Sequence, residues 1–357
     1  MPDDFNAAEF STHAATELNG SAGTPPSEAP AKTITAVADR YAVAITPVMK
    51  DLIDPFDPDD PIARQFVPDL QELEESDTEL PDPIGDLSNS PVKGIIHRYP
   101  DRLLLIPLKI CPVYCRFCFR REQVGHFADT TLNDQELEAA LDYIRAHDEV
   151  WEVILSGGDP LILSPRRLRR IIQSLNNIDH VKVIRIHTRV PVVSPERVNN
   201  DLIQALESPR ALFVVLHTNH TKELTPAATK ACARLIDNGF PMLSQSVLLR
   251  GVNDDTDTLE TLLRTLVENR IKPYYLHHPD KARGTSHFST SLQEGRQLVR
   301  ELRGRVSGLC QPEYILDIPG GAGKVPSGPE WIKSSGDNYV VTDYRGNEHR
   351  YTDKTGR

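Results

Sequence analysis

Residues 111–118 of the chain read CPVYCRFC, so three cysteines fall within eight positions with the spacing C-x3-C-x2-C. An apolar run over 103–110 leads directly into them and is typical of a buried strand. The cysteines are therefore expected on the loop at the C-terminal end of this strand. Clustered thiolates of this kind select zinc or an iron–sulfur cluster.

The number of cysteines favours the cluster. A structural zinc ion takes four ligands, often as two separated pairs, and the remaining cysteines, Cys232 and Cys310, are far away in the sequence. A cubane cluster usually has four cysteine ligands, so three of them leave one iron open to a small molecule. An open iron indicates chemistry, and a structural zinc site or a chance grouping of cysteines are the alternatives.

The composition argues against several classes of protein. The chain has 357 residues and a net charge of −11, which disfavours a general role in binding nucleic acid or membrane surfaces. Five cysteines do not indicate a disulfide framework, and ligating thiols suit a reduced compartment. No apolar run approaches a membrane span of about 20 residues, and the acidic start does not resemble a secretory signal. We expect a cytoplasmic protein.

The chain divides into four segments. Residues 1–32 have no periodic apolar pattern, which predicts a disordered tail. Residues 33–96 combine short helical spacing with acidic, proline-rich passages, which predicts a wrapping segment over a core domain, with nothing to suggest catalysis. The core is expected over 97–289, and residues 290–357 form a C-terminal region that ends in a hairpin.

From residue 103 onward, short β-branched runs alternate with helical patterns. The expected strands are 103–108, 151–155, 181–187, 212–217, 242–247 and 272–276, and the expected helices are 134–147, 165–176, 195–207, 226–238, 254–269 and 290–303. Alternating units imply a parallel sheet with right-handed crossovers. Six units fall short of a closed eight-fold barrel, so we predict an α/β fold, an open partial (βα)6 TIM-like barrel, with its chemistry at the C-terminal strand ends.

Polar residues do follow the expected strands. The second strand is followed by Ser156, Gly157, Gly158 and Asp159, where glycines let a ligand approach the backbone and Asp159 can accept from an ammonium group. An ordinary β-turn explains these four residues equally well. The later strands are followed by His187, Arg189, His217, Asn219, His220, Gln245, Ser246, His277, His278 and Asp280. The histidines lack a fixed spacing such as H-E-x-x-H, which disfavours a histidine metal site.

A glycine-rich loop near the C-terminus carries one lysine. Residues 319–324 read PGGAGK and follow an expected strand over 314–318. A phosphate-binding P-loop needs Ser or Thr after its lysine, whereas Val325 and Pro326 follow here. The functional interpretation is that Lys324 forms a Schiff base with a carbonyl cofactor. The alternative is an exposed loop lysine.

Together these motifs resemble the lysine 2,3-aminomutase family of the radical S-adenosylmethionine superfamily. The similarity covers residues 45–351, and it is carried by HRYPDR at 97–102, the cysteine block at 111–121, SGGD at 156–159, QSVLLRGVND at 245–254, KPYY at 272–275 and DIPGGAGK at 317–324. The thiol spacing is similar to that of the superfamily as a whole.

The resemblance implies three cofactors. Cys111, Cys115 and Cys118 would hold a [4Fe-4S] cluster, whose open iron binds S-adenosylmethionine, and Lys324 would carry pyridoxal 5′-phosphate. The residues that match S-adenosylmethionine or other cofactor positions are Ser156, Gly157, Gly158, Asp159 and Gln245. Those that match positions near the cofactor phosphate are Arg98, Tyr99 and Arg102; arginine suits such a dianion by its fork geometry.

The resemblance also implies a substrate and a reaction. Arg120 would pair with the substrate α-carboxylate, while Asp280 and Asp317 would hold the far amino group of L-lysine, because two carboxylates select a cationic side chain over glutamate. The implied reaction interconverts L-lysine and β-lysine (3,6-diaminohexanoate) by 2,3-migration of the α-amino group, so the protein would be an isomerase. An electron donor such as flavodoxin or ferredoxin and a homo-oligomeric state are also implied.

Other functions remain open from the sequence. A related enzyme that modifies a lysine of elongation factor P, or an aminomutase for another amino acid, would share most of these residues. The sequence around Asp317 resembles the free-lysine enzymes more closely. A non-enzymatic zinc or iron–sulfur protein would need the thiols but not Lys324.

Overall fold

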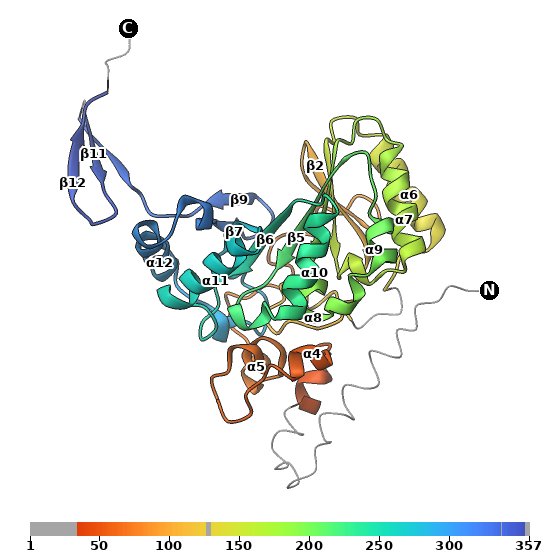
Figure 1. Cartoon of the computed structure of the whole chain (residues 1–357), viewed down its shortest axis with the longest axis horizontal. Helices are drawn as coiled ribbons and strands as arrows, with labels where there is room; N and C mark the ends of the chain where they lie inside the picture. The colour runs from red at the N-terminus through yellow and green to blue at the C-terminus, as the bar shows by residue number, and fades with distance from the viewer. Residues whose placement is uncertain (1–33, 126–129, 337, 354–357) are drawn as a thin grey trace.

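The computed structural model describes residues 34–125, 130–336 and 338–353, so the expected tail over 1–32 lies outside the described residues. Its main sheet has nine strands: β1 Ile95–Tyr99, β2 Arg102–Leu108, β3 Glu152–Gly157, β4 Val183–Thr188, β5 Ala211–His217, β6 Met242–Val247, β7 Lys272–His277, β8 Glu313–Ile318 and β9 Gly323–Pro326. The strands follow one another in sequence order across the sheet (Figure 1).

The sheet forms an open barrel. Strands β2 to β8 pair in parallel, and β1 and β9 are antiparallel additions at its two edges. The larger helices connect the parallel strands and cover their outer face: α6 Asp134–Arg145, α7 Pro165–Asn176, α8 Val190–Val193, α9 Asn200–Ala205, α10 Pro226–Asp237, α11 Thr256–Glu268 and α12 Leu292–Arg305. The main apolar core lies between these helices and the sheet. The predicted α/β fold with a partial barrel is confirmed.

Several details differ from the prediction. The edge strands β1 and β9 were not expected, and Lys324 lies on β9 and not on the expected loop. The sheet contains one more parallel strand than the six expected, because β8 pairs with β7. The helix expected over 195–207 is shorter: the 3-10 helix η3 Pro195–Arg197 comes first, and α9 begins only after Asn199, whose side chain accepts from the Leu202 N–H. An Asn that caps the helix in this way interrupts the helical pattern at that point.

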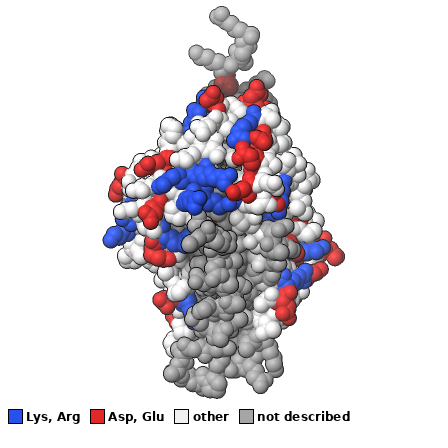
Figure 2. Space-filling view, turned by 90° about the vertical axis from the view of Figure 1, so that its right-hand side faces the viewer, with Lys and Arg blue, Asp and Glu red and all other residues white. Residues whose placement is uncertain are grey.

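The barrel helices begin at capping residues and bury one apolar face. Helix α7 begins after Ser164, whose hydroxyl accepts from the Arg167 N–H, and it buries Leu168, Ile171 and other apolar residues against the sheet. Its opposite face carries exposed arginines. Figure 2 shows Lys and Arg side chains gathered in one cluster among mixed charges on this side of the molecule. The buried apolar face and the exposed arginines make α7 an amphipathic surface helix.

The wrapping segment crosses the loops that follow the barrel strands. Its short helices are α4 Pro47–Lys50, α5 Pro61–Phe66 and η1 Leu70–Leu73, of which α4 and α5 lie below the barrel in Figure 1. Backbone hydrogen bonds join it to the loop after β2 and to the loop after β7, through Arg116 N–H to Gln65 O and Leu80 N–H to Lys281 O. The segment is therefore part of the structure around the strand ends.

The C-terminal strands form a separate sheet that projects from the barrel (Figure 1). Strands β10 Ile332–Ser335, β11 Asn338–Thr342 and β12 Glu348–Tyr351 pair antiparallel, and the predicted hairpin corresponds to β11 and β12. Within the described parts of the chain, no helix is both long and apolar enough to cross a lipid bilayer.

Candidate active site

A cavity of about 690 Å³ lies inside the barrel. Alternate side chains of β3 and β4 face it, as the two-residue period of a strand requires: Glu152, Ile154 and Ser156, then Val183, Arg185 and His187. Towards the C-terminal strand ends it reaches the cysteine loop (residues 111–118), and towards the N-terminal ends it reaches Asp101 and Trp151. The cavity therefore extends along the barrel interior.

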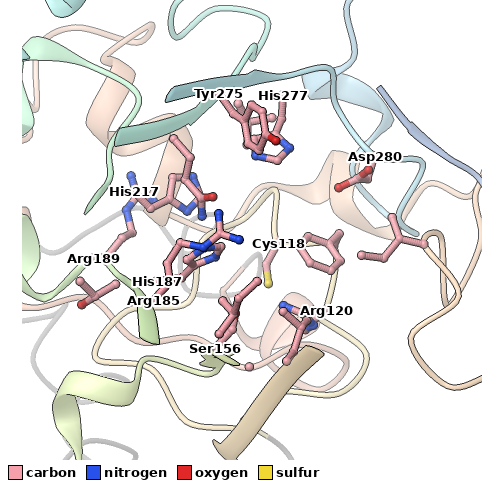
Figure 3. Close-up of a pocket in the computed structure, with 18 of the residues that line it drawn as sticks. Cys118, Arg120, Ser156, Arg185, His187, Arg189, His217, Tyr275, His277 and Asp280 are labelled. Atoms are coloured by element: carbon pink, nitrogen blue, oxygen red, sulfur yellow. The ribbon is translucent and has the colours of Figure 1, made fainter. Parts of the chain in front are cut away.

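The structure brings nearly all of the predicted site residues to this cavity. Its wall contains Arg98, Tyr99, Arg102, Cys111, Cys115, Cys118, Arg120, Ser156, Gly157, Gly158, Asp159, Gln245, Asp280 and Lys324. Asp317 lies behind Lys324 and accepts a hydrogen bond from its Nζ. Figure 3 shows Arg189 and His217 on one side of the cavity, with Arg120 and Asp280 on the other.

The three cysteines are free thiols in the cavity wall. Removal from bulk water raises the pKa of the Cys118 thiol to about 11 and raises that of Cys111 well above its ordinary value. Thiolates at Cys111 and Cys118 therefore require a bound cation or cluster to stabilise them. No group of three His, Cys, Asp or Glu side chains in the described residues is arranged to hold a single metal ion. Three thiols that face an open cavity fit a cluster with one open corner.

The loop after β3 packs against the cysteine loop. The Gly158 N–H donates to Leu108 O over 2.9 Å, and a Cβ at this position would lie 2.1 Å from the carbonyl oxygen of Ile110. Only glycine allows the two backbones to approach this closely. Gly157 has a positive φ of 102°, which also favours glycine.

Asp159 has a structural task in this loop. It is buried, and its carboxylate accepts from the Thr188 hydroxyl over 2.7 Å and from the Arg189 N–H over 2.7 Å. The Val190 and Leu161 N–H groups also donate to it. Asp159 therefore fixes the start of the loop after β4.

Lys324 lies among acids and arginines. Its Nζ donates to Asp317 Oδ2, and Arg98 Nη1 approaches Asp317 Oδ1 at 3.5 Å. Burial lowers the pKa of Lys324 to about 8, although Asp280 acts to raise it. Burial likewise raises the pKa of Asp280 to about 6, although Lys324 and other cations oppose this. Near neutral pH this lower pKa leaves a larger fraction of Lys324 as the free amine than an exposed lysine has, and attack on a carbonyl requires the free amine.

The surroundings of Lys324 fit a cofactor that carries both a carbonyl and a phosphate. The Arg102 guanidinium stacks on the Tyr99 ring at 3.8 Å, and Arg98 contacts Asp317 nearby. Paired arginines suit a phosphate dianion. Asp317 Oδ1 is buried without a hydrogen-bond partner, so this end of the cavity still has an acceptor to offer a ligand.

Sequence reasoning missed two acids in the wrapping segment, where it saw nothing catalytic. Asp86 is 1% exposed and accepts a 2.6 Å hydrogen bond from Arg120 Nε. Glu72 is completely buried and pairs with Arg116 and Arg121, on either side of the last cysteine. Their local sequence is acidic and proline-rich like that of their exposed neighbours, so no local signal distinguished them.

Neutral histidines and aromatic rings complete the wall near the cysteines. Burial lowers the pKa of His187, His217 and His277 well below the ordinary value, so these side chains are uncharged at neutral pH. The Phe117 ring lies edge-on to His217 at 5.9 Å and to Phe288 at 6.0 Å. This part of the cavity therefore suits an uncharged aromatic group.

The barrel and its thiol loop define a radical S-adenosylmethionine enzyme. The family model described as "Radical SAM superfamily" matches residues 105–263, and the one described as "Lysine-2,3-aminomutase" matches residues 299–355. The L-lysine 2,3-aminomutase of Clostridium subterminale is 41% identical over 305 residues, which cover 85% of this chain and 73% of that protein. The chain belongs to the lysine 2,3-aminomutase family.

The chain is also similar to an aminomutase of another name and to solved structures. The glutamate 2,3-aminomutase of Clostridioides difficile is 36% identical over 308 residues, covering 86% of this chain and 72% of that protein. A crystal structure of a radical SAM methyltransferase from Sphaerobacter thermophilus aligns with a TM-score of 0.44 and 18% identity, covering 65% of this chain and 72% of that one. Family membership confirms that the protein is an isomerase, and it implies an iron–sulfur cluster, S-adenosylmethionine and pyridoxal phosphate as cofactors.

Proposed function

We propose that the protein interconverts free L-lysine and β-lysine by 2,3-migration of the α-amino group, with pyridoxal phosphate bound at Lys324. The observation that carries the proposal is the pair of acids in the surroundings of Lys324, the partly exposed Asp280 and the buried Asp317. Two carboxylates would neutralise the terminal ammonium group of lysine, whereas the side chain of glutamate would add a third negative charge.

Each cofactor has a place in this proposal. When bound, the cluster and S-adenosylmethionine supply the radical that removes a hydrogen atom, and pyridoxal phosphate supplies the carbonyl group that holds the migrating nitrogen. Cys111, Cys115 and Cys118 would hold the cluster. Gly158 would let the cosubstrate approach the backbone, together with the further candidates Ser156, Gly157, Asp159 and Gln245. The phosphate would lie against Arg98, Tyr99 and Arg102.

The protein's own charges would orient the substrate. Asp86 holds Arg120 at Nε, and the guanidinium has further donors with which to bind the α-carboxylate. In the structure, Lys324 Nζ donates a hydrogen bond to the Asp317 carboxylate. A cofactor held covalently at Lys324 would engage this amine and would leave the Asp317 carboxylate free to bind the ammonium group of the substrate. The same exchange would link cofactor loading to lysine binding.

A product assay tests the proposal. Protein prepared without oxygen, reconstituted with iron and sulfide, and supplied with pyridoxal phosphate, S-adenosylmethionine and dithionite is incubated with L-lysine, L-glutamate or elongation factor P. We expect β-lysine from free lysine alone. Formation of β-glutamate without β-lysine would indicate a glutamate aminomutase instead. Product on elongation factor P only would indicate that the substrate is a protein. A colourless zinc protein without borohydride-trapped cofactor would indicate a binding protein instead.

Three further expectations accompany this function as proposals. A flavodoxin or a ferredoxin would supply the electron, the protein would form a homo-oligomer, and it would work in the cytoplasm.

A further inference from the structure

Arg189 connects the end of β4 with the cysteine loop. Its Nη1 donates a hydrogen bond to Cys115 Sγ over 2.9 Å, and its side chain is 6% exposed. Its backbone N–H donates to Asp159, so the residue is held at both the main chain and the side chain. Arg189 is therefore a buried cation in direct contact with one of the three thiols.

A buried acid fixes this arginine. Glu223 is completely buried and accepts from Arg189 Nη2 over 2.6 Å. The Asn219 and His220 N–H groups donate to the same carboxylate, each over 2.9 Å. Because so many donors converge on Glu223, it cannot move without breaking several buried hydrogen bonds, and Arg189 is held with it.

The wrapping segment closes the other side. Gln65 accepts from Arg189 Nη2 over 3.0 Å and donates to Glu223 over 3.2 Å. The guanidinium also lies 4.9 Å from the Phe66 ring and 5.6 Å from the Phe117 ring. These groups enclose one side of the guanidinium, and its burial strengthens the electrostatic interaction with the Cys115 sulfur.

We infer that Arg189 is a positioning residue that raises the reduction potential of the iron–sulfur cluster through its hydrogen bond to the Cys115 sulfur. Reduction adds one electron to the cluster and increases the negative charge on its sulfur ligands. A fixed N–H donor with a positive charge stabilises that reduced form more than the oxidised form. Glu223 bonds to the other terminal nitrogen, Nη2, and only partly offsets the positive charge that acts on the sulfur through Nη1.

This inference rests on the proposed function, because it needs a cluster on the three cysteines. The effect of Arg189 on the reduction potential does not depend on which substrate the protein uses or on the migration of the amino group. The reductant is any one-electron donor of sufficiently low potential, and dithionite serves in the test. Without Arg189 the same donor would reduce a smaller fraction of the cluster.

The test is a redox titration of the reconstituted protein without S-adenosylmethionine, followed by electron paramagnetic resonance of the reduced cluster. Iron and sulfide contents are measured in parallel. For Arg189→Gln we expect full cluster content and an approximately tenfold lower ratio of reduced to oxidised cluster at a fixed potential, or about 59 mV for one electron. Arg189→Lys should shift the midpoint less, because it keeps the charge but loses the planar fork.

The matched control is Arg197→Gln. Arg197 also follows β4, and its guanidinium donates to Ile162 O. Among the described residues it makes no hydrogen bond to the cysteine loop. It should leave the midpoint unchanged. Glu223→Gln removes the opposing charge and should move the midpoint in the positive direction. If Arg189→Gln takes up no cluster, Glu223→Gln provides the test instead. An unchanged midpoint potential in Glu223→Gln would then overturn the inference.

The outcomes separate this inference from the proposed function. A wild-type protein that takes up no cluster would overturn the function itself. A full cluster with a wild-type midpoint in Arg189→Gln would overturn only the role of Arg189. If that variant instead lost affinity for S-adenosylmethionine at an unchanged midpoint, Arg189 would be a cosubstrate ligand and the inference would be wrong.

Discussion

Tyr99 and Lys324 join the two edge strands of the barrel sheet: the Tyr99 hydroxyl accepts a 2.7 Å hydrogen bond from the Lys324 backbone N–H. Strands β1 and β9 do not pair with each other in the described sheet, so this bond crosses the open seam of the barrel. Arg98 and Asp317 meet across the same seam at 3.5 Å. The candidate cofactor residues therefore lie on both sides of this seam.

Replacing Lys324 by alanine should abolish covalent trapping of pyridoxal phosphate. Borohydride reduction followed by mass spectrometry of the peptides should find the cofactor on Lys324 of the wild type and on no peptide of the variant. Lys333 is an exposed lysine of β10, and Lys333→Ala serves as the control that keeps the label. Trapping at another lysine in the Lys324→Ala variant would show that the carbonyl-binding residue has been misassigned.

Asp280→Asn should lower kcat/KM for L-lysine by about 30-fold or more. Loss of one partner of a buried charge pair costs about 2–5 kcal/mol, and each 1.4 kcal/mol is tenfold. The control is Asp237→Asn, whose carboxylate is 61% exposed and far from the cavity in the fold. Steady-state kinetics of β-lysine formation measure both variants. An unchanged kcat/KM in Asp280→Asn would remove this residue from the lysine site.

Binding of lysine should weaken as the pH falls through about 6. Burial raises the pKa of Asp280 to about 6 from its ordinary value of 3.8, so this carboxylate becomes protonated and loses its charge at a higher pH than an exposed aspartate does. The measurement is KM for lysine between pH 5 and about 8, within the range where ordinary aspartates stay ionised. In Asp280→Asn the change in KM near pH 6 should disappear. If the change persists in this variant, another group is responsible for it.

Glu72→Gln should destabilise the protein by about 3–5 kcal/mol, because it breaks a buried ion pair and leaves two arginines without their acid. Glu72 is completely buried against Arg116 and Arg121. Nearby in the chain, Glu75 pairs with Arg40 but is 57% exposed, and Glu75→Gln should cost at most about 1 kcal/mol. Denaturant unfolding compares the two. Equal effects would mean that the buried pair does not hold the cysteine loop in place.

Gly158→Ala should prevent normal packing of the cysteine loop. The added Cβ would lie 2.1 Å from the Ile110 carbonyl oxygen, and backbone cannot yield as a flexible side chain would. We expect less iron and sulfide after reconstitution and weaker binding of S-adenosylmethionine by calorimetry. Gly308 has open space around its Cβ position and no strained backbone, so Gly308→Ala should behave as the wild type. Full cluster content and unchanged affinity in Gly158→Ala would contradict this account.

Much of the barrel could be predicted because its signals are local. Helix α7 begins and ends at the predicted residues 165 and 176, since Ser164 and Pro165 mark its start and apolar residues recur at helical spacing. The parallel pairing of β8 with β7 was not predicted, because the choice of neighbour depends on how the chain returns to the sheet. The division of the chain into four segments stays a prediction.

The sequence by itself predicted the candidate groups: the thiols at 111, 115 and 118, the lysine after a glycine-rich turn and, through the family resemblance, the acids at 280 and 317. Only the tertiary structure showed which of many similar charged residues lie at the cavity or contact the residues that line it. Asp86 and Arg120 are 34 positions apart, and Arg189 and Cys115 are 74 apart. Burial makes these charges effective, and burial depends on segments distant in the chain, which local sequence does not specify.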